Sequence, residues 1–229
     1  MTKTSNSVSV LFMLYGILFC VCLIAANALE IKQISVGPAN FTAGLIVFPI
    51  SYILNDVICE VWGYKKARLI IWTGFAMNFL FVALAAIADA IPGADFWNGD
   101  EAFHKVFGLA PRICAASFLA FLSGSFVNAY VMSRMKISSN GRHFSYRAIM
   151  STIFGEGTDS IIFFPLAFLG VIPTEELPSL IISQVIVKTI YEIIILPVTI
   201  RVVNFTKRYE QEDIYDNNVS YSIWKIFNL

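Results

Sequence analysis

Four ionisable side chains lie deep inside the last two long apolar stretches of the sequence: Glu156, Asp159, Lys188 and Glu192. An ionisable group at the centre of a bilayer costs about 2.5–3.5 kcal/mol on insertion scales, so such groups usually face a cavity or one another. Glu156 and Asp159 are three residues apart and therefore share one side of a helix. Buried carboxylates of this kind can bind a proton, a cation or a polar small molecule.

A polar stripe follows one face of the final apolar stretch. Gln184, Lys188 and Glu192 recur every four residues, with Tyr191 beside them, in a segment otherwise rich in Ile, Leu and Val. At helical spacing these side chains form one continuous line. A single lysine cannot neutralise three carboxylates, so at least one acid is left without a cation. The structural alternative is that Lys188 pairs with Glu192 or Asp159 only to hold two helices together.

Another apolar stretch contains a series of small residues that ends in an amide. Ala116, Ala120, Gly124 and Asn128 recur every four residues, a spacing typical of a close helix-packing face. Asn128 is then either an interhelical hydrogen-bonding group or a ligand contact.

Tyr52, Asp56 and Glu60 also share one helical face, near the end of an earlier apolar stretch. They have two interpretations. Glu60 could cap the membrane interface by meeting one of the basic residues that follow it, which are Lys65, Lys66 and Arg68. Alternatively, the two acids line an inner gate or coupling site.

The composition indicates that these residues are positioned by membrane-spanning helices. Of the 229 residues, 57% are hydrophobic and only 14% are charged, whereas a soluble domain needs a more charged surface. A stretch of about 20 apolar residues crosses a hydrocarbon core about 30 Å thick. Six such stretches occur: Val8–Leu29, Val36–Cys59, Ala67–Ile91, Pro111–Met132, Tyr146–Gly170 and Ser179–Val203. Because lipid cannot satisfy exposed backbone groups, we predict an all-α fold with six transmembrane helices.

We predict a single integral membrane domain over residues 1–229, ending in a short cytoplasmic tail at 204–229. Ala26-Asn27-Ala28 resembles a signal-peptidase site, so cleavage of the first stretch is an alternative that leaves five spans. The formal net charge of zero gives no electrostatic reason to expect a nucleic acid partner.

The distribution of Lys and Arg predicts the orientation. If the N-terminus is cytoplasmic, twelve of the sixteen basic residues lie in inner segments, three in outer loops (Lys32, Lys105 and Arg112), and Lys188 within a span. This bias follows the positive-inside rule, so we predict that both termini are cytoplasmic.

Two motifs resemble signatures of the queuosine precursor transporter family. The first is Asp56-Val-Ile-Cys-Glu-Val-Trp-Gly-Tyr-Lys-Lys-Ala-Arg68, preceded by Phe48-Pro49, and the second is Phe154-Gly-Glu-Gly-Thr-Asp-Ser-Ile-Ile-Phe-Phe-Pro165. The sixth stretch fits the same pattern, and the resemblance covers all six. Trp62, Asn55 and the C-terminal tail depart from the usual family sequence.

The resemblance implies a multi-pass protein of the bacterial cytoplasmic (inner) membrane that imports 7-deazaguanine bases for queuosine modification of tRNA. Its cargo would be 7-cyano-7-deazaguanine, 7-aminomethyl-7-deazaguanine or queuine. No enzymatic activity, cofactor, metal or obligatory ATPase is expected. The oligomeric state stays open, a homodimer included, and so does the energy coupling, whether by proton, sodium or facilitated diffusion.

The chemistry of such a base fits the predicted site. A guanine-like edge presents two adjacent N–H donors, which a carboxylate accepts together. Our hypothesis is that Glu156 and Asp159 read this edge while Lys188 and Glu192 set their charge. Other residues have expected supporting roles: Lys188, Gln184 or Asn128 donate to the base carbonyl, and Tyr191, Phe163 or Phe164 stack on the ring.

Two other classes of protein compete with a stand-alone carrier. A substrate-binding subunit of an energy-coupling-factor transporter also has about six helices, but it needs a separate ATPase module. An intramembrane enzyme is the more remote alternative. An aspartyl protease needs paired aspartates at one depth, and a serine hydrolase needs an intramembrane histidine. Both histidines of this chain, His104 and His143, lie between the apolar stretches.

Overall fold

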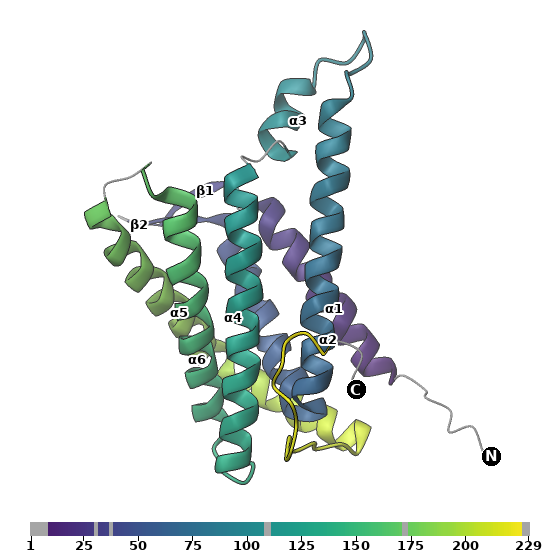
Figure 1. The fold of residues 1–229 in the computed structure, drawn as a ribbon, viewed down its shortest axis with the longest axis vertical. Helices are drawn as coiled ribbons and strands as arrows, with labels where there is room; N and C mark the ends of the chain where they lie inside the picture. The colour runs from purple at the N-terminus through teal and green to yellow at the C-terminus, as the bar shows by residue number, and fades with distance from the viewer. Residues whose placement is uncertain (1–8, 30–31, 37–38, 108–110, 171–173, 226–229) are drawn as a thin grey trace, which may run out of the picture.

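The computed structural model describes residues 9–29, 32–36, 39–107, 111–170 and 174–225. The elements run in the order α1 (Val10–Leu29), β1 (Gln33–Val36), β2 (Ala39–Thr42), the 3-10 turn η1 (Ala43–Ile46), α2 (Phe48–Ala90), α3 (Asp100–Phe107), α4 (Pro111–Ser138), α5 (Phe144–Phe168), the 3-10 turn η2 (Thr174–Glu176) and α6 (Leu177–Glu210). Long helices dominate this bundle (Figure 1), which confirms the predicted all-α class.

The element α2 consists of two helices joined at Gly63, which has φ 80° and ψ 172°. Positive φ favours glycine because it carries no Cβ. Before Gly63 the chain runs parallel to α4. Tyr52 lies beside Phe121, and the Cys59 thiol donates a hydrogen bond to the Ala129 carbonyl oxygen. After Gly63 it runs back along α4 in the opposite direction, and Figure 1 shows it rising toward α3. The predicted second and third spans are therefore the two arms of α2.

The predicted second span begins too early. Residues Val36–Cys59 were expected to form one helix, but β1 and β2 form an antiparallel hairpin, and the helix starts only at Phe48. An apolar run does not by itself distinguish strand from helix. The start of α2 has a local cause in Pro49, which occupies its first turn and has a backbone preset for that position.

Several other boundaries differ from the prediction by a few residues. The helix α4 continues to Ser138 rather than Met132, and α6 continues to Glu210 rather than Val203. The short helix α3 lies in a loop that the sequence left without structure. Both long helices end in basic residues, which complement the partial negative charge of a helix C-terminus.

Four helical segments in the described ranges are long and apolar enough to cross a membrane: Val10–Leu29, Ala43–Ala90, Ala115–Ser138 and Ile181–Glu210. Since the second contains both arms of α2, these segments cover five of the six predicted spans. The helix α5 has 25 residues, enough to cross, but it contains the acids Glu156 and Asp159. Exposed isoleucines cover one side of α6, including Ile182, Ile186 and Ile193. This surface suits contact with lipid, and the chain is a multi-pass membrane protein.

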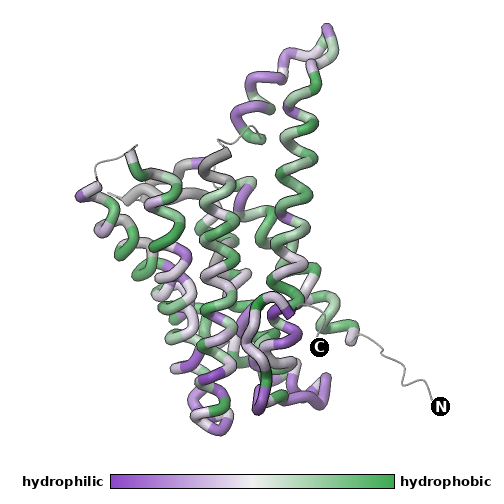
Figure 2. Tube along the Cα trace, viewed as in Figure 1, coloured by the Kyte–Doolittle hydropathy of each residue, from purple (hydrophilic) through white to green (hydrophobic). Residues whose placement is uncertain are grey.

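Polar residues gather at one end of the bundle. The turn between α4 and α5 and the segment after α6 lie at the lower end in Figure 1, and the Gly63 reversal is there too, since Tyr64 hydrogen-bonds to Asp216 of that segment. Figure 2 shows many hydrophilic residues at this end and others in and around α3 at the opposite end, while the long helices between are largely apolar. We refer to the lower end below as the basic end, because Arg147, Lys136 and Lys207 are located there.

The segment that follows α6 is not merely a polar tail. Residues 211–225 fold back over the Gly63 reversal and pack against α2 and α4. Asp216 is 5% exposed and accepts hydrogen bonds from the backbone N–H of Tyr64, at 2.9 Å, and from the Ser133 hydroxyl. The Arg68 guanidinium donates to the carbonyl oxygens of Ser220 and Ser222. We call this segment the C-terminal strap.

Candidate functional site

The centre of the site is an ion-paired group that joins α5 to α6. Lys188 Nζ lies 2.6 Å from Glu156 Oε2 and 3.5 Å from Asp159 Oδ2. Glu156 is 1% exposed, Asp159 is 6% exposed and Lys188 is 9% exposed. In a low-dielectric surrounding such a group is stable only when its charges are paired and hydrogen-bonded. Three of the four ionisable residues singled out by the sequence thus meet in one place.

Lys188 leaves part of this acidic group unsatisfied. Within the described ranges, the buried atoms Glu156 Oε1 and Glu192 Oε1 have no hydrogen-bond partner. Glu192 is 1% exposed and close enough to Glu156 to interact with it electrostatically. An unsatisfied buried acceptor has a high free-energy cost. These two oxygens are therefore suited to accept N–H donors from a ligand.

Two glycines bring α4 and α5 into close contact beside this group. A Cβ built on Gly124 would lie 2.8 Å from the Gly155 carbonyl oxygen and 2.5 Å from the Tyr52 hydroxyl. A Cβ on Gly155 would lie 2.7 Å from Asn128 Cβ. The small residues predicted as a packing face therefore do pack, and they bring Tyr52 and Asn128 next to Glu156. Gly157, on the other side of Glu156, has open space around it.

Asn128 forms an interhelical hydrogen bond, one of the two roles that its position left open. Its Oδ1 accepts from Asn55 Nδ2 at 2.7 Å, and the same Asn55 amide donates to the Ser125 carbonyl oxygen at 3.1 Å. Both asparagines are buried. The sequence had marked Asn55 only as a departure from the family pattern, because an amide inside an apolar run does not reveal its partner.

Asp56 lies farther along the same interior surface and is 0% exposed. Its two carboxylate oxygens are each 3.1 Å from Ser151 Oγ of α5. Asn128 of α4 and Glu192 of α6 are its other polar neighbours from facing helices. Asp56 therefore contributes to the interior of the bundle and not to its surface.

Glu60 is the centre of a second ionic group, at the basic end. Its carboxylate accepts two hydrogen bonds from the Arg147 guanidinium and one from Lys207 at 2.6 Å. Lys136 donates to the Glu60 carbonyl oxygen and lies 2.5 Å from Asp213 in the C-terminal strap. This group ties α2, α4, α5, α6 and the strap together.

The basic partners of Glu60 differ from those expected for an interfacial cap. Lys66 pairs with Glu212, and Arg68 binds backbone carbonyls of the strap. Arg147 and Lys207 were missed as partners because they lie 87 and 147 residues from Glu60 along the chain.

Two further residues predicted for the site, Tyr191 and Gln184, belong to α6. Tyr191 is half-buried, next to Glu192. Gln184 belongs to α6, but its side chain lies outside the described residues. In the part of the chain that the structure describes, no three His, Cys, Asp or Glu side chains are arranged to hold a metal ion.

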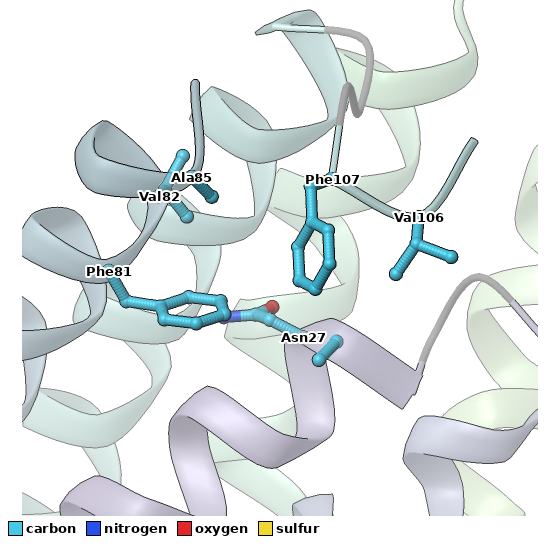
Figure 3. Close-up of a pocket in the computed structure, with 7 residues that line it drawn as sticks. Asn27, Phe81, Val82, Ala85, Val106 and Phe107 are labelled. Atoms are coloured by element: carbon cyan, nitrogen blue, oxygen red, sulfur yellow. The ribbon is translucent and has the colours of Figure 1, made fainter. Parts of the chain in front are cut away.

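A small apolar pocket lies away from these acids. The last turn of α1, the second arm of α2 and α3 line it, with Asn27, Phe81 and Phe107 among its walls (Figure 3). The Asn27 amide oxygen accepts a hydrogen bond from the Ser117 hydroxyl at 3.0 Å. Since none of the predicted site residues lines this pocket, it is not part of the candidate site.

A multi-pass helical fold with paired and unpaired acids buried at the meeting point of four helices is typical of a membrane carrier for a small polar solute. Comparison with known families agrees. The profile of the family described as "Putative vitamin uptake transporter" matches residues 42–202, and the chain belongs to this family.

Several transporters of known name are similar in sequence. The chain is 27% identical over 177 residues to the "Probable queuosine precursor transporter" of Bacillus subtilis (strain 168), which covers 76% of each chain. It is 26% identical over 144 residues to the "Queuosine precursor transporter" of Escherichia coli (strain K12), over 63% of this chain and 62% of that one. No solved structure matches the chain.

Proposed function

We propose that this protein imports a 7-deazaguanine base, a precursor of queuosine, across the bacterial cytoplasmic membrane. The observation that carries the proposal is the buried Glu156–Lys188–Asp159 group, with Glu156 Oε1 left without a partner. The names of the similar transporters support the same class of cargo.

The recognition chemistry follows from the groups at the site. A 7-deazaguanine presents an N–H and an amino group side by side, and a carboxylate accepts both with good geometry. Glu156 and Asp159 are the carboxylates that we assign to this edge. Lys188 then donates to the base carbonyl oxygen while keeping the site from carrying the full charge of its acids.

Other residues have supporting roles in this proposal. Glu192 contributes charge and a second acceptor, and Asn128 and Gln184 are amide donors to the carbonyl edge. Tyr191 is the aromatic group that stacks on the ring, an interaction worth about 1–3 kcal/mol per base in other proteins.

We further propose that the ionic group around Glu60 is the inner gate. It closes the basic end across four helices, and Tyr52 and Asp56 lie between it and the base site. By the positive-inside rule this end faces the cytoplasm, so both termini are cytoplasmic. Release of the base then requires the Arg147 and Lys207 contacts to open. An ATPase partner is not required by this scheme.

The proposed function is tested in a bacterial strain that neither makes nor imports 7-deazaguanines. The gene is expressed, each base is supplied separately, and queuosine in tRNA is measured. Restoration by at least one base, dependent on the gene, is the expected result. No restoration by any base, with the protein present in the membrane, would overturn the proposal.

A further inference from the structure

Two buried acids lie between the base site and the Glu60 group. Asp56 of α2 is 0% exposed and Glu192 of α6 is 1% exposed. They are close enough to interact electrostatically. Within the described ranges neither acid has an ion-pair partner: Lys188 pairs with Glu156 and Asp159, whereas Arg147 and Lys207 pair with Glu60. Two adjacent buried carboxylates without a cation cannot both be ionised at low cost, so binding of one proton stabilises the pair.

Ser151 of α5 is placed to hydrogen-bond to Asp56 in either protonation state. Ser151 Oγ lies 3.1 Å from each oxygen of Asp56 and 2.8 Å from the Ala148 carbonyl oxygen. A hydroxyl has one proton to donate, and a carbonyl can only accept. If Ser151 donates to the shorter contact, the contact with Asp56 is a hydrogen bond only when the Asp56 carboxyl donates. When Ser151 donates to Asp56 instead, Asp56 is ionised, so the same serine can hydrogen-bond to Asp56 with or without a bound proton.

Among the described residues, the charged and titratable groups around this pair come from α2, α5 and α6. Asp56 faces Glu192 from α6 and has Glu60 and Cys59 as neighbours in α2, and its described polar neighbours from α4 and α5 are the neutral side chains Asn128 and Ser151. Glu192 faces Asp56 from α2 and Glu156 from α5, and shares α6 with Lys188. The surroundings are thus predominantly acidic, which favours a bound proton.

We propose that Asp56 and Glu192 form a proton-binding site that couples import of the base to the proton gradient. This inference rests on the proposed function and adds its energy source. A proton that enters from the outer side binds to one carboxylate oxygen of the pair and lowers the negative charge next to Glu156. Glu156 then stays ionised and accepts the N–H donors of the base. When the inner gate opens, the base and the proton leave together, and the pair is ready for the next proton.

The test uses purified protein in liposomes and tritiated 7-cyano-7-deazaguanine, a neutral base, so that any charge moved belongs to the proton. Exchange of labelled for unlabelled base at equal pH measures turnover alone. Accumulation is then measured with the interior made alkaline, and again after a protonophore collapses the gradient. We expect the wild type to concentrate the base above its external level only while the gradient is present.

For each variant we take the ratio of base uptake with the pH gradient to base uptake without it. A change in the overall transport rate cancels in this ratio. We expect this ratio to fall to one for Asp56→Asn and Glu192→Gln. It should keep its wild-type value for Glu101→Gln, whose side chain is 83% exposed in α3. As a second readout, detergent-solubilised wild type in weak buffer should take up protons when the base is added, and neither Asp56→Asn nor Glu192→Gln should.

The outcomes separate the two proposals. Wild-type exchange without any response to the gradient overturns proton coupling and leaves base transport standing. A full gradient response in both Asp56→Asn and Glu192→Gln overturns the assignment of the pair. Absence of exchange with all three 7-deazaguanines overturns the proposed function itself, and the coupling inference with it. If one of the two variants is unstable in liposomes, the proton-uptake measurement on the other variant decides whether the pair binds the proton.

Discussion

Lys188 of α6 forms a 2.6 Å ion pair with Glu156 of α5, and both side chains are buried in the helix bundle. The pair joins residues 32 positions apart and positions the charged centre of the proposed base site.

Breaking the pair from one side should destabilise the protein strongly. Lys188→Met leaves Glu156 and Asp159 buried without a cation, and the loss of one partner of a buried ion pair costs about 3–5 kcal/mol. The double variant Glu156→Gln/Lys188→Met removes both charges and should recover a large part of that loss. Thermal unfolding in detergent measures both.

The matched control for this comparison is Lys105→Met. Its partner Glu101 and Lys105 itself are largely exposed, and an exposed pair contributes at most about 1 kcal/mol. If Lys188→Met were as stable as Lys105→Met, the buried pair would not have the structural importance given to it here.

The contact between α4 and α5 predicts different effects for two neighbouring glycines. Gly155→Ala places a methyl group 2.7 Å from Asn128 Cβ and 3.0 Å from the Gly124 carbonyl oxygen, so the helices must separate. We expect a loss of about 1–3 kcal/mol from overpacking and a clear drop in uptake. Gly157→Ala meets no atom within 4 Å and should retain stability and uptake. Equal behaviour of the two variants would contradict the proposed packing.

The C-terminal strap should contribute to the closure of the basic end. Asp216 accepts a hydrogen bond from the Tyr64 backbone N–H directly after Gly63, much as a side chain caps a helix start. Asp216→Ala should cost about 0.5–2 kcal/mol and make the strap more sensitive to protease. Asn217→Ala, at an exposed neighbouring position, is the control. A strap equally resistant in both variants would argue against this capping role.

Asp213, at the start of the strap, predicts a pH dependence. Although partial burial opposes ionisation, hydrogen bonds from Lys136 and Lys207 hold the pKa of the Asp213 carboxyl below its ordinary value of 3.8. A carboxylate with a lowered folded-state pKa stabilises the fold above its ordinary pKa, and this contribution is lost as the pH falls through the folded value.

At neutral pH, Asp213→Asn should therefore unfold at a lower temperature than the wild type. This difference should shrink as the pH is lowered past 3.8. Glu175→Gln, at an exposed position in η2, should match the wild type at both pH values. A difference for Asp213→Asn that persists unchanged in acid would contradict the assigned ion pairs.

The sequence predicted the parts of this structure that depend on local pattern. The high free-energy cost of burying Glu156, Asp159, Lys188 and Glu192 in a membrane indicated the site. The apolar stretches indicated the helices. The hairpin before α2 was missed because the apolar stretch was extended back through Ala39–Thr42, which instead pairs with Gln33–Val36.

Long-range partners could not be predicted from spacing alone. The Arg147–Glu60 pair and the return of the strap onto Tyr64 depend on how helices far apart in sequence come together. Spacing within α6 suggested a Lys188–Glu192 pair as one structural option, but Lys188 reaches across to α5 instead. The side chain of Asp56 was expected near the interface, and it is buried instead because α4, α5 and α6 all pack around it.

The central claim is that Glu156 and Asp159 read the base, and uptake of labelled 7-deazaguanine by cells tests it most directly. The variants are Glu156→Gln and Asp159→Asn, alone and combined, with protein levels in the membrane measured in parallel. Thr158→Ala is the control, since the Thr158 hydroxyl bonds only to its own helix among the described contacts. We predict loss of uptake in the double variant and wild-type uptake in Thr158→Ala. Undiminished uptake by the double variant at normal protein level would contradict the proposed site.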